Sequence, residues 1–159
     1  MTEPRVVPLD FLSPDPRTIS RAAKLLTDGE LVVAPTETRY GLLGRADLPD
    51  VLERIYRIKG RAAKQPMAIF VRSVPMILHY ASVPSSAERL ARRFLPGPLT
   101  LVLKRLPGCD CPVVYKGKIG VRVSSAPFIR QLLECVTFPL TATSANLSGR
   151  GCRQRKGDA

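Results

Sequence analysis

The sequence predicts a single α/β (α+β) domain built around one β-sheet. Helical patterns and short apolar strands are interleaved along the chain, which favours helices packed against a common sheet. The chain has 159 residues, and a single domain commonly takes about 100–200. Hydrophobic residues make up 45% of it, which is typical of a chain with a buried core rather than a disordered one.

The first helix is expected to begin at Asp15-Pro16, with Asp15 as the N-cap and proline at the first helical position. Its apolar residues recur at helical spacing, and Gly29 is the natural end of the helix. The apolar run Leu31–Ala34, ended by Pro35, predicts a buried strand.

A second helix is predicted over Leu48–Lys59, where apolar residues again share one face. A strand over Met67–Val71 and a weaker helix over Val74–Tyr80 follow. Ser85 and Glu88 form a capping-box pattern, which predicts a helix that ends near Phe94.

The second half of the chain begins with the rigid break Pro96-Gly97-Pro98. The elements predicted after it are strands over Leu99–Lys104, Ile119–Val123 and Pro139–Thr143, a helix over Pro127–Cys135, and a loop over Leu106–Lys118.

The chain is strongly basic, with 25 Lys and Arg against 13 Asp and Glu and a net charge of +12. This excess indicates an anionic partner such as a phosphate, a nucleotide or RNA, although a solvated surface explains it as well. No apolar run approaches the roughly 18 residues of a membrane helix, and no secretory signal is recognised, so we expect a cytoplasmic protein with no membrane partner.

The cysteines stand at positions 109, 111, 135 and 152, without a second pair at zinc-finger spacing. We therefore expect free thiols and no metal held by the protein. His79, the single histidine, is expected to pack within a helix.

Polar and conformationally special residues gather in four segments. Two of them directly follow predicted strands, where open α/β sheets place their ligands. The segments are Pro35–Gly41, Lys59–Pro66, Gly120–Val123 and Thr141–Gly149.

Arg122 is the single charge in an otherwise apolar strand, so burying it requires an anionic partner. A ligand carboxylate or phosphate would fit its planar fork. A protein carboxylate, or exposure of the strand at a sheet edge, would explain it equally. Lys59, Arg61 and Lys64 are similarly open to two interpretations, a phosphate clamp or a solvated cluster at a helix C-terminus.

Five motifs in order resemble the threonylcarbamoyl-AMP synthase (YrdC-like) family. Its pattern runs Pro-Thr-[Asp/Glu]-Thr-x-Tyr-Gly-Leu, Lys-Gly-Arg-Pro, Pro-Gly-Pro-[Leu/Val]-Thr-Leu, x-x-Arg-x-Pro and Thr-Ser-Ala-Asn-x-Ser-Gly. The matching segments are Pro35–Leu42, Lys59–Arg61, Pro96–Leu101, Val121–Val123 and Thr143–Gly149.

The resemblance implies a twisted mixed sheet flanked by helices, with a basic concave face. It also implies formation of threonylcarbamoyl-AMP from L-threonine, bicarbonate and ATP, for the t6A modification of tRNA at adenosine 37. ATP would be a substrate accompanied by Mg²⁺, without a prosthetic group. tRNA and the proteins of the t6A pathway would be further partners.

The resemblance also assigns roles to residues. Thr36, Thr38, Arg122 and Ser144 would bind threonine, with Arg122 on its carboxylate. Lys59 and Arg61 would act on the ATP phosphates as the catalytic pair, and Asn146 would contact the nucleotide.

The chain departs from the family pattern at several positions, among them Arg39, Ala62, Gln65, Phe70 and Ser124. After Ser148-Gly149 the family continues with a helix and a Ser-Thr-Val-Val-Asp strand, whereas this chain continues with Arg150–Ala159. We therefore expect a domain over residues 1–149 that is incomplete at its C-terminal end, followed by a basic tail over 150–159. A missing strand would leave a sheet edge exposed.

Three functions remain open at this point. The first is the synthase, for which a carbamoyl-adenylating relative of the hydrogenase-maturation type is the variant within the family. The second is a module of the same fold that binds double-stranded RNA or tRNA, which the charge favours. The third is an inactive, truncated relative.

Overall fold

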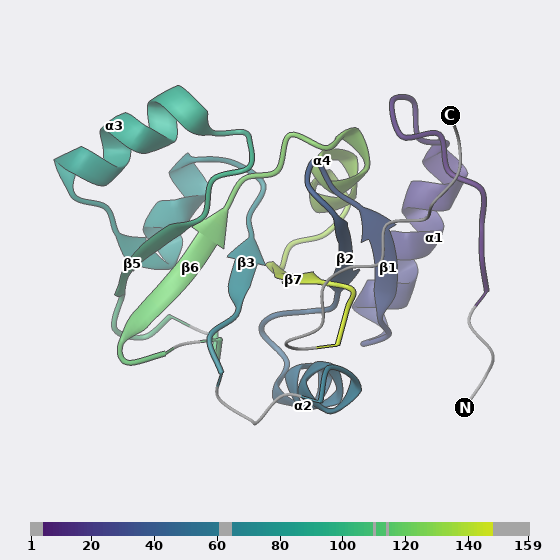
Figure 1. The fold of residues 1–159 in the computed structure, drawn as a ribbon, viewed down its shortest axis with the longest axis horizontal. Coiled ribbons are helices and arrows are strands. Elements are labelled where there is room, and N and C mark those ends of the chain that lie inside the picture. The colour runs from purple at the N-terminus through teal and green to yellow at the C-terminus, as the bar shows by residue number, and fades with distance from the viewer. Residues whose placement is uncertain (1–4, 61–64, 110, 114, 148–159) are drawn as a thin grey trace.

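The computed structural model describes residues 5–60, 65–109, 111–113 and 115–147. Within these residues the chain forms four α-helices, one 3-10 helix and seven strands that make a single sheet (Figure 1). The predicted boundary at residue 149 lies outside the described residues.

The sheet is mixed, with the strand order β1-β2-β7-β3-β6-β5-β4. Only β3 and β6 pair in parallel, and all the other neighbours are antiparallel. The strands are β1 (Val32–Pro35), β2 (Tyr40–Leu43), β3 (Ala68–Phe70), β4 (Ala81–Ser82), β5 (Leu101–Arg105), β6 (Lys118–Arg122) and β7 (Leu140–Ser144).

Two hydrophobic cores lie on opposite faces of this sheet. Neighbouring residues of a strand point to opposite faces, and β3 accordingly gives Ile69 to one core and Phe70 to the other. β2 divides Leu42 and Leu43 in the same way. The helices α1 (Pro16–Thr27) and α4 (Pro127–Glu134) pack together over Leu43 and Phe70.

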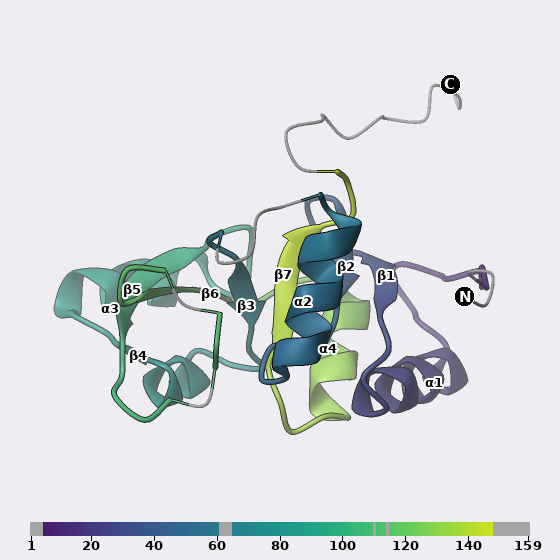
Figure 2. The same ribbon diagram turned by 90° about the horizontal axis from the view of Figure 1, so that it is seen from below.

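The opposite face is covered by α2 (Pro49–Ile58), the 3-10 helix η1 (Pro75–His79) and α3 (Ser85–Phe94). Figures 1 and 2 together place β7 between α2 and α4. Both faces of the sheet centre are therefore buried, which explains why Leu140 is fully enclosed.

The layer formed by α1 and α4 does not extend over β5 and β6. On this face Val102 of β5 is 67% exposed, and Lys104 and Lys118 are exposed as well. Arg122 at the end of β6 lies beside Phe70 in the strand register, so it stands where the helical cover ends. An open, polar region of the sheet thus begins at Arg122.

The predicted helices and the five predicted strands are confirmed to within two residues at each end. β2 was not predicted because its first residues belong to a polar motif, and β4 is only a two-residue strand. The capping box was wrong, because Pro84 is the N-cap of α3 and Glu88 binds Arg92 instead. No described helix is both long and apolar enough to span a bilayer.

Candidate functional site

Two polar turns meet at one end of the sheet. Residues 36–39 follow β1 and residues 145–147 follow β7, and β1 and β7 run in the same direction because each pairs antiparallel with β2. Gly41 lies opposite Ser144, and the Ala145 amide donates to the Tyr40 carbonyl at 2.8 Å. The polar segments that begin at Pro35 and Thr141 therefore lie side by side.

Thr36 holds the turn of residues 36–39 in shape. Its hydroxyl donates to the Arg39 carbonyl at 2.6 Å and accepts from the amides of Thr38 and Arg39, each at 3.2 Å. A threonine hydroxyl bonded in this way to its own backbone stabilises a tight turn. Thr36 thus places Glu37 and Thr38 over the sheet.

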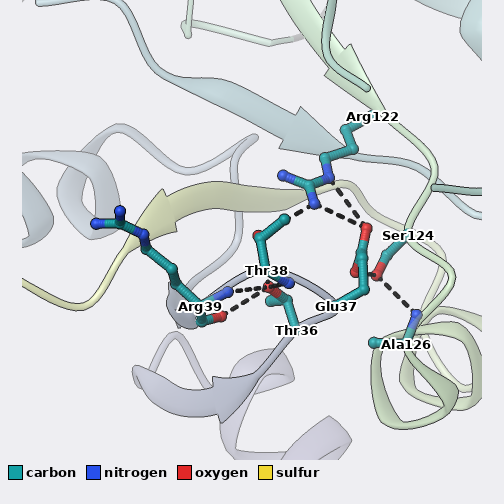
Figure 3. A network of polar contacts seen from close by, with 7 residues as sticks. All are labelled: Thr36, Glu37, Thr38, Arg39, Arg122, Ser124 and Ala126. Carbon is teal, nitrogen blue, oxygen red and sulfur yellow. Dashed lines mark hydrogen bonds and ion pairs between the residues drawn. The ribbon is translucent and has the colours of Figure 1, made fainter. Parts of the chain in front are cut away.

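Glu37 and Arg122 form an ion pair across the sheet face (Figure 3). Glu37 Oε1 accepts from Arg122 Nη2 at 2.8 Å and from Nε at 3.2 Å, and Nη2 also donates to Thr38 Oγ1 at 3.2 Å. The side chains are 14% and 12% exposed. The sequence allowed Arg122 to pair with a protein carboxylate, and Glu37 is that carboxylate. The alternative that Arg122 lies on an edge strand is wrong, because β6 lies between β3 and β5.

Ser124 completes this network. Its hydroxyl donates to Glu37 Oε2 and accepts from the Ala126 amide, at 3.2 Å, where α4 begins. Burial alone would raise the pKa of Glu37, but the hydrogen bonds from Ser124, from its own backbone and from Arg122, with the charge of Arg122, together lower that pKa below 4.5. Glu37 is accordingly a carboxylate at neutral pH.

A pocket of about 110 Å³ opens beside Arg122. Its wall combines one guanidinium, several hydroxyls and the Phe70 ring, whose centroid is 5.7 Å from Arg122 Cζ. The lining residues are Thr36, Thr38, Arg39, Tyr40, Gly41, Phe70, Arg122, Ala142, Thr143 and Ser144. Pockets for drug-sized ligands measure about 300–1,000 Å³, so this pocket suits a smaller molecule that carries a carboxylate or another anionic group.

Lys59, directly after α2, is 3% exposed and points towards the turn after β7. Its Nζ donates to the carbonyls of Ser144 and Asn146, the latter at 2.8 Å. The interpretation of Lys59 as a solvated surface charge is therefore wrong. Arg61 and Lys64, the other residues of that basic segment, lie outside the described residues.

The side chains of Ser144 and Asn146 are joined, because the Ser144 hydroxyl donates to Asn146 Oδ1. Asn146 Nδ2 donates to the Leu147 carbonyl at 3.1 Å. Lys59, Ser144 and Asn146 thus form one connected group, which meets the pocket at Ser144.

No three His, Cys, Asp or Glu side chains gather into a metal-ligand set in the described part of the chain. Cys109 and Cys111 are buried free thiols, and burial raises the pKa of Cys111 to about 11. Cys135 is free and exposed, and Cys152 lies outside the described residues. The expectation for His79 was wrong, since it is exposed at the end of η1.

Thr36, Thr38, Arg122 and Ser144, predicted together from motifs up to about 100 residues apart, line one pocket. The sequence interpretation missed Glu37 and Ser124 as partners of Arg122. Ser124 lies two residues after Arg122 and so on the same side of an extended chain, which is the one signal that could have linked them.

Comparisons with known proteins find relatives across most of this chain. Residues 24–158 match the sequence model of the Sua5/YciO/YrdC family, which is described as "Telomere recombination". The threonylcarbamoyl-AMP synthase of Bacillus subtilis is 35% identical over 144 residues, which is 89% of this chain and 42% of that protein. The corresponding protein of Pyrococcus abyssi is 39% identical over 133 residues, which is 81% of this chain and 38% of that protein.

Among solved structures, the chain resembles the Pyrococcus abyssi Sua5 complexed with L-threonine. The TM-score is 0.79 at 35% identity, over 87% of this chain and 41% of that one. The chain thus spans roughly two fifths of the length of these relatives.

Proposed function

Because this chain belongs to the Sua5/YciO/YrdC family, we propose that it is a threonylcarbamoyl-AMP synthase. It would join L-threonine, bicarbonate and ATP into threonylcarbamoyl-AMP, releasing pyrophosphate and water. The observation that carries the proposal is the pocket of about 110 Å³ in which Arg122, Thr38 and Ser144 converge. The L-threonine bound to the similar Pyrococcus abyssi Sua5 supports the same substrate.

Arg122 supplies the charge that a threonine carboxylate needs. Nε and Nη2 of its guanidinium already bind Glu37, and Nη1 remains to donate to a ligand carboxylate. Thr38 and Ser144 add hydroxyls, and Phe70 adds an apolar wall for the threonine methyl group. Thr36 acts by shaping the turn that carries Thr38.

ATP is proposed to lie at the mouth of the pocket, with Mg²⁺ arriving as part of this substrate and without a prosthetic group. Lys59 and Arg61 are assigned to the phosphates and Asn146 to the nucleotide. In this reaction the threonine amine and bicarbonate form a carbamate with loss of water. A carbamate oxygen then attacks the α-phosphorus of ATP, and pyrophosphate leaves. Positioning and charge neutralisation therefore supply most of the catalysis.

The buried Lys59 would connect the two substrates. Its Nζ is bonded to the carbonyls of Ser144 and Asn146, which are assigned to threonine and nucleotide respectively. Holding both carbonyls with one cation would fix the turn between the two substrates. We place the protein in the cytoplasm, where its product would serve the modification of tRNA at adenosine 37.

The proposal is tested by incubating the chain with ATP, Mg²⁺, bicarbonate and L-threonine and measuring pyrophosphate. We expect release that requires threonine and that falls strongly when serine or glycine replaces it. Release at the same rate with glycine, or without any amino acid, would contradict the proposed function.

A further inference from the structure

We propose that Glu37 and Ser124 are positioning residues, which orient the guanidinium of Arg122 so that its remaining edge can bind a carboxylate in the pocket. The inference rests on the proposed function, because it assigns to Arg122 the carboxylate of an amino acid substrate. It concerns how this chain prepares that arginine before a ligand arrives.

Glu37 contacts only one edge of the Arg122 guanidinium. A single oxygen, Oε1, accepts from both Nε and Nη2, at 3.2 and 2.8 Å. Nη2 has a second acceptor in Thr38 Oγ1. Nη1 has no hydrogen-bond acceptor among the described residues. One edge of the guanidinium is therefore held by protein, and the Nη1 end is left for a ligand.

The second step is the side from which Glu37 approaches. Arg122 and Thr38 line the pocket, whereas Glu37 does not. Figure 3 shows Glu37 and Ser124 together on one side of Arg122, with Arg39 on the other side. Glu37 thus holds Arg122 without occupying the place of a ligand, which argues against a role as an internal competitor.

The third step is the anchoring of Glu37 itself. Ser124 is 1% exposed, and its hydroxyl donates to Glu37 Oε2 while it accepts from the amide of Ala126 at 3.2 Å. Both carboxylate oxygens of Glu37 are consequently fixed, one by Arg122 and the other by a residue tied to the start of α4. Positioning groups act best when their own conformations are locked by neighbours.

The chain contains a matched control for this pair. On α3, Glu88 Oε1 accepts from Arg92 Nε at 3.2 Å and from Nη2 at 2.6 Å, the same one-oxygen arrangement as in Glu37–Arg122. The control pair is solvated, with side chains 77% and 51% exposed, and it does not line the pocket. Glu88→Gln therefore removes a comparable carboxylate away from the site.

The experiment compares the wild-type chain with Glu37→Gln, Ser124→Ala and Glu88→Gln. For each, titration calorimetry gives the affinity for L-threonine and separately for ATP with Mg²⁺, and thermal unfolding gives the melting temperature. Nitrogen-15 NMR follows the Arg122 Nε–H signal, identified by its loss in Arg122→Lys. This signal reports the orientation of the guanidinium without any ligand.

We expect Glu37→Gln to weaken threonine binding by about tenfold or more, because the charge-assisted contact that orients Arg122 is lost. Ser124→Ala should weaken threonine binding less. ATP binding should change by less than about twofold, and Glu88→Gln should match the wild type throughout. The Arg122 Nε–H signal should be protected from solvent exchange in the wild type and clearly less protected in Glu37→Gln, because an amide oxygen accepts more weakly than a carboxylate.

Three results would overturn the inference. One is an Arg122 signal as strongly protected in Glu37→Gln as in the wild type. Another is equal loss of threonine and ATP binding with a lower melting temperature. The third is tighter threonine binding, which would make Glu37 a competitor. A wild-type chain that binds no threonine contradicts the proposed function instead. In that case the NMR comparison still decides whether Glu37 orients Arg122.

Discussion

At the scale of single residues, Arg122 pairs with the carboxylate of Glu37 and also lines the pocket, which Glu37 does not. Arg122→Lys keeps the positive charge but loses the planar fork. Losing one charge-assisted contact removes about 1.5–3 kcal/mol, or roughly ten- to a hundredfold in threonine affinity. ATP affinity should stay close to that of the wild type.

Calorimetry on Arg122→Lys checks this expectation, and Arg92→Lys is the control because it alters the solvated pair on α3. If Arg122→Lys has a lower melting temperature but binds threonine normally, Arg122 does not bind threonine. That result would leave Arg122 with the purely structural ion pair that the sequence also allowed.

Glu37 gives the site a dependence on pH. Its pKa in the folded chain is lower than the ordinary value of 4.5, so its contribution to stability is fully present above about pH 4.5 and is lost as the pH falls through the lowered pKa. Urea unfolding of the wild type and of Glu37→Gln should differ by a constant amount from about pH 7 to about pH 5 and converge in more acidic solution. A difference that does not shrink at all as the pH falls below about 4.5 would show that Glu37 does not act as a carboxylate.

At the scale of elements, the two turns of the site depend on the pairing of β2 with β7. Thr141 is fully buried in this pairing, where its hydroxyl donates to the Leu42 carbonyl and accepts from the Gly44 amide, both at 3.0 Å. Thr141→Val keeps the shape of the side chain but leaves two buried backbone groups without their partner. We expect a loss of about 1–3 kcal/mol in the free energy of unfolding.

Denaturant unfolding measures this loss, and Thr27→Val is the control. The Thr27 hydroxyl bonds only to the Ala23 carbonyl within α1, near solvent, so its removal should cost less than about 1 kcal/mol. Equal losses in the two variants would show that the β2–β7 junction is not specially dependent on Thr141.

The sequence predicted elements well where an apolar pattern was bounded by strong end signals. Asp15-Pro16 and Gly29 enclose α1, and the Asp15 side chain accepts from the Arg17 amide at 3.2 Å as a cap should. Prediction from the sequence failed where pairing with distant strands decides the structure. Tyr40–Leu43 becomes a strand because β1 and β7 lie on either side of it, and no local pattern carries that information.

The same limit applies to the site. The motifs singled out Thr38, Arg122 and Ser144, and these residues do meet in one pocket. The motifs did not show that Lys59 points inward or that Glu37 folds back over the sheet to Arg122. Both depend on turns whose direction is set by contacts about 85 residues apart in the sequence.

At the scale of the whole molecule, the net charge is +12. Two of the positive charges lie close together on the part of the sheet that α1 and α4 do not cover. Lys104 of β5 lies directly opposite Lys118 of β6, both are exposed, and neither forms an ion pair with a described residue. Like charges in this position destabilise a sheet, and an RNA phosphate would relieve the repulsion.

If this face binds tRNA, the affinity for tRNA should fall steeply as the salt concentration rises. The double variant Lys104→Ala/Lys118→Ala should reduce the slope of log affinity against log salt concentration by up to about two. Lys24→Ala on α1, where Lys24 pairs with Asp28, should leave the slope unchanged. Filter binding at several salt concentrations measures this. Weak tRNA binding that saturating ATP abolishes would instead assign the charge to the nucleotide.

The central claim is that the pocket beside Arg122 holds L-threonine by its carboxylate. The most direct test is calorimetric titration of the wild-type chain with L-threonine and with L-threoninol, in which a neutral hydroxymethyl group replaces the carboxylate that Arg122 would bind. The account predicts that L-threonine binds and that L-threoninol binds at least about tenfold more weakly, with the difference abolished in Arg122→Lys. Equal affinity for the two compounds in the wild type would contradict it.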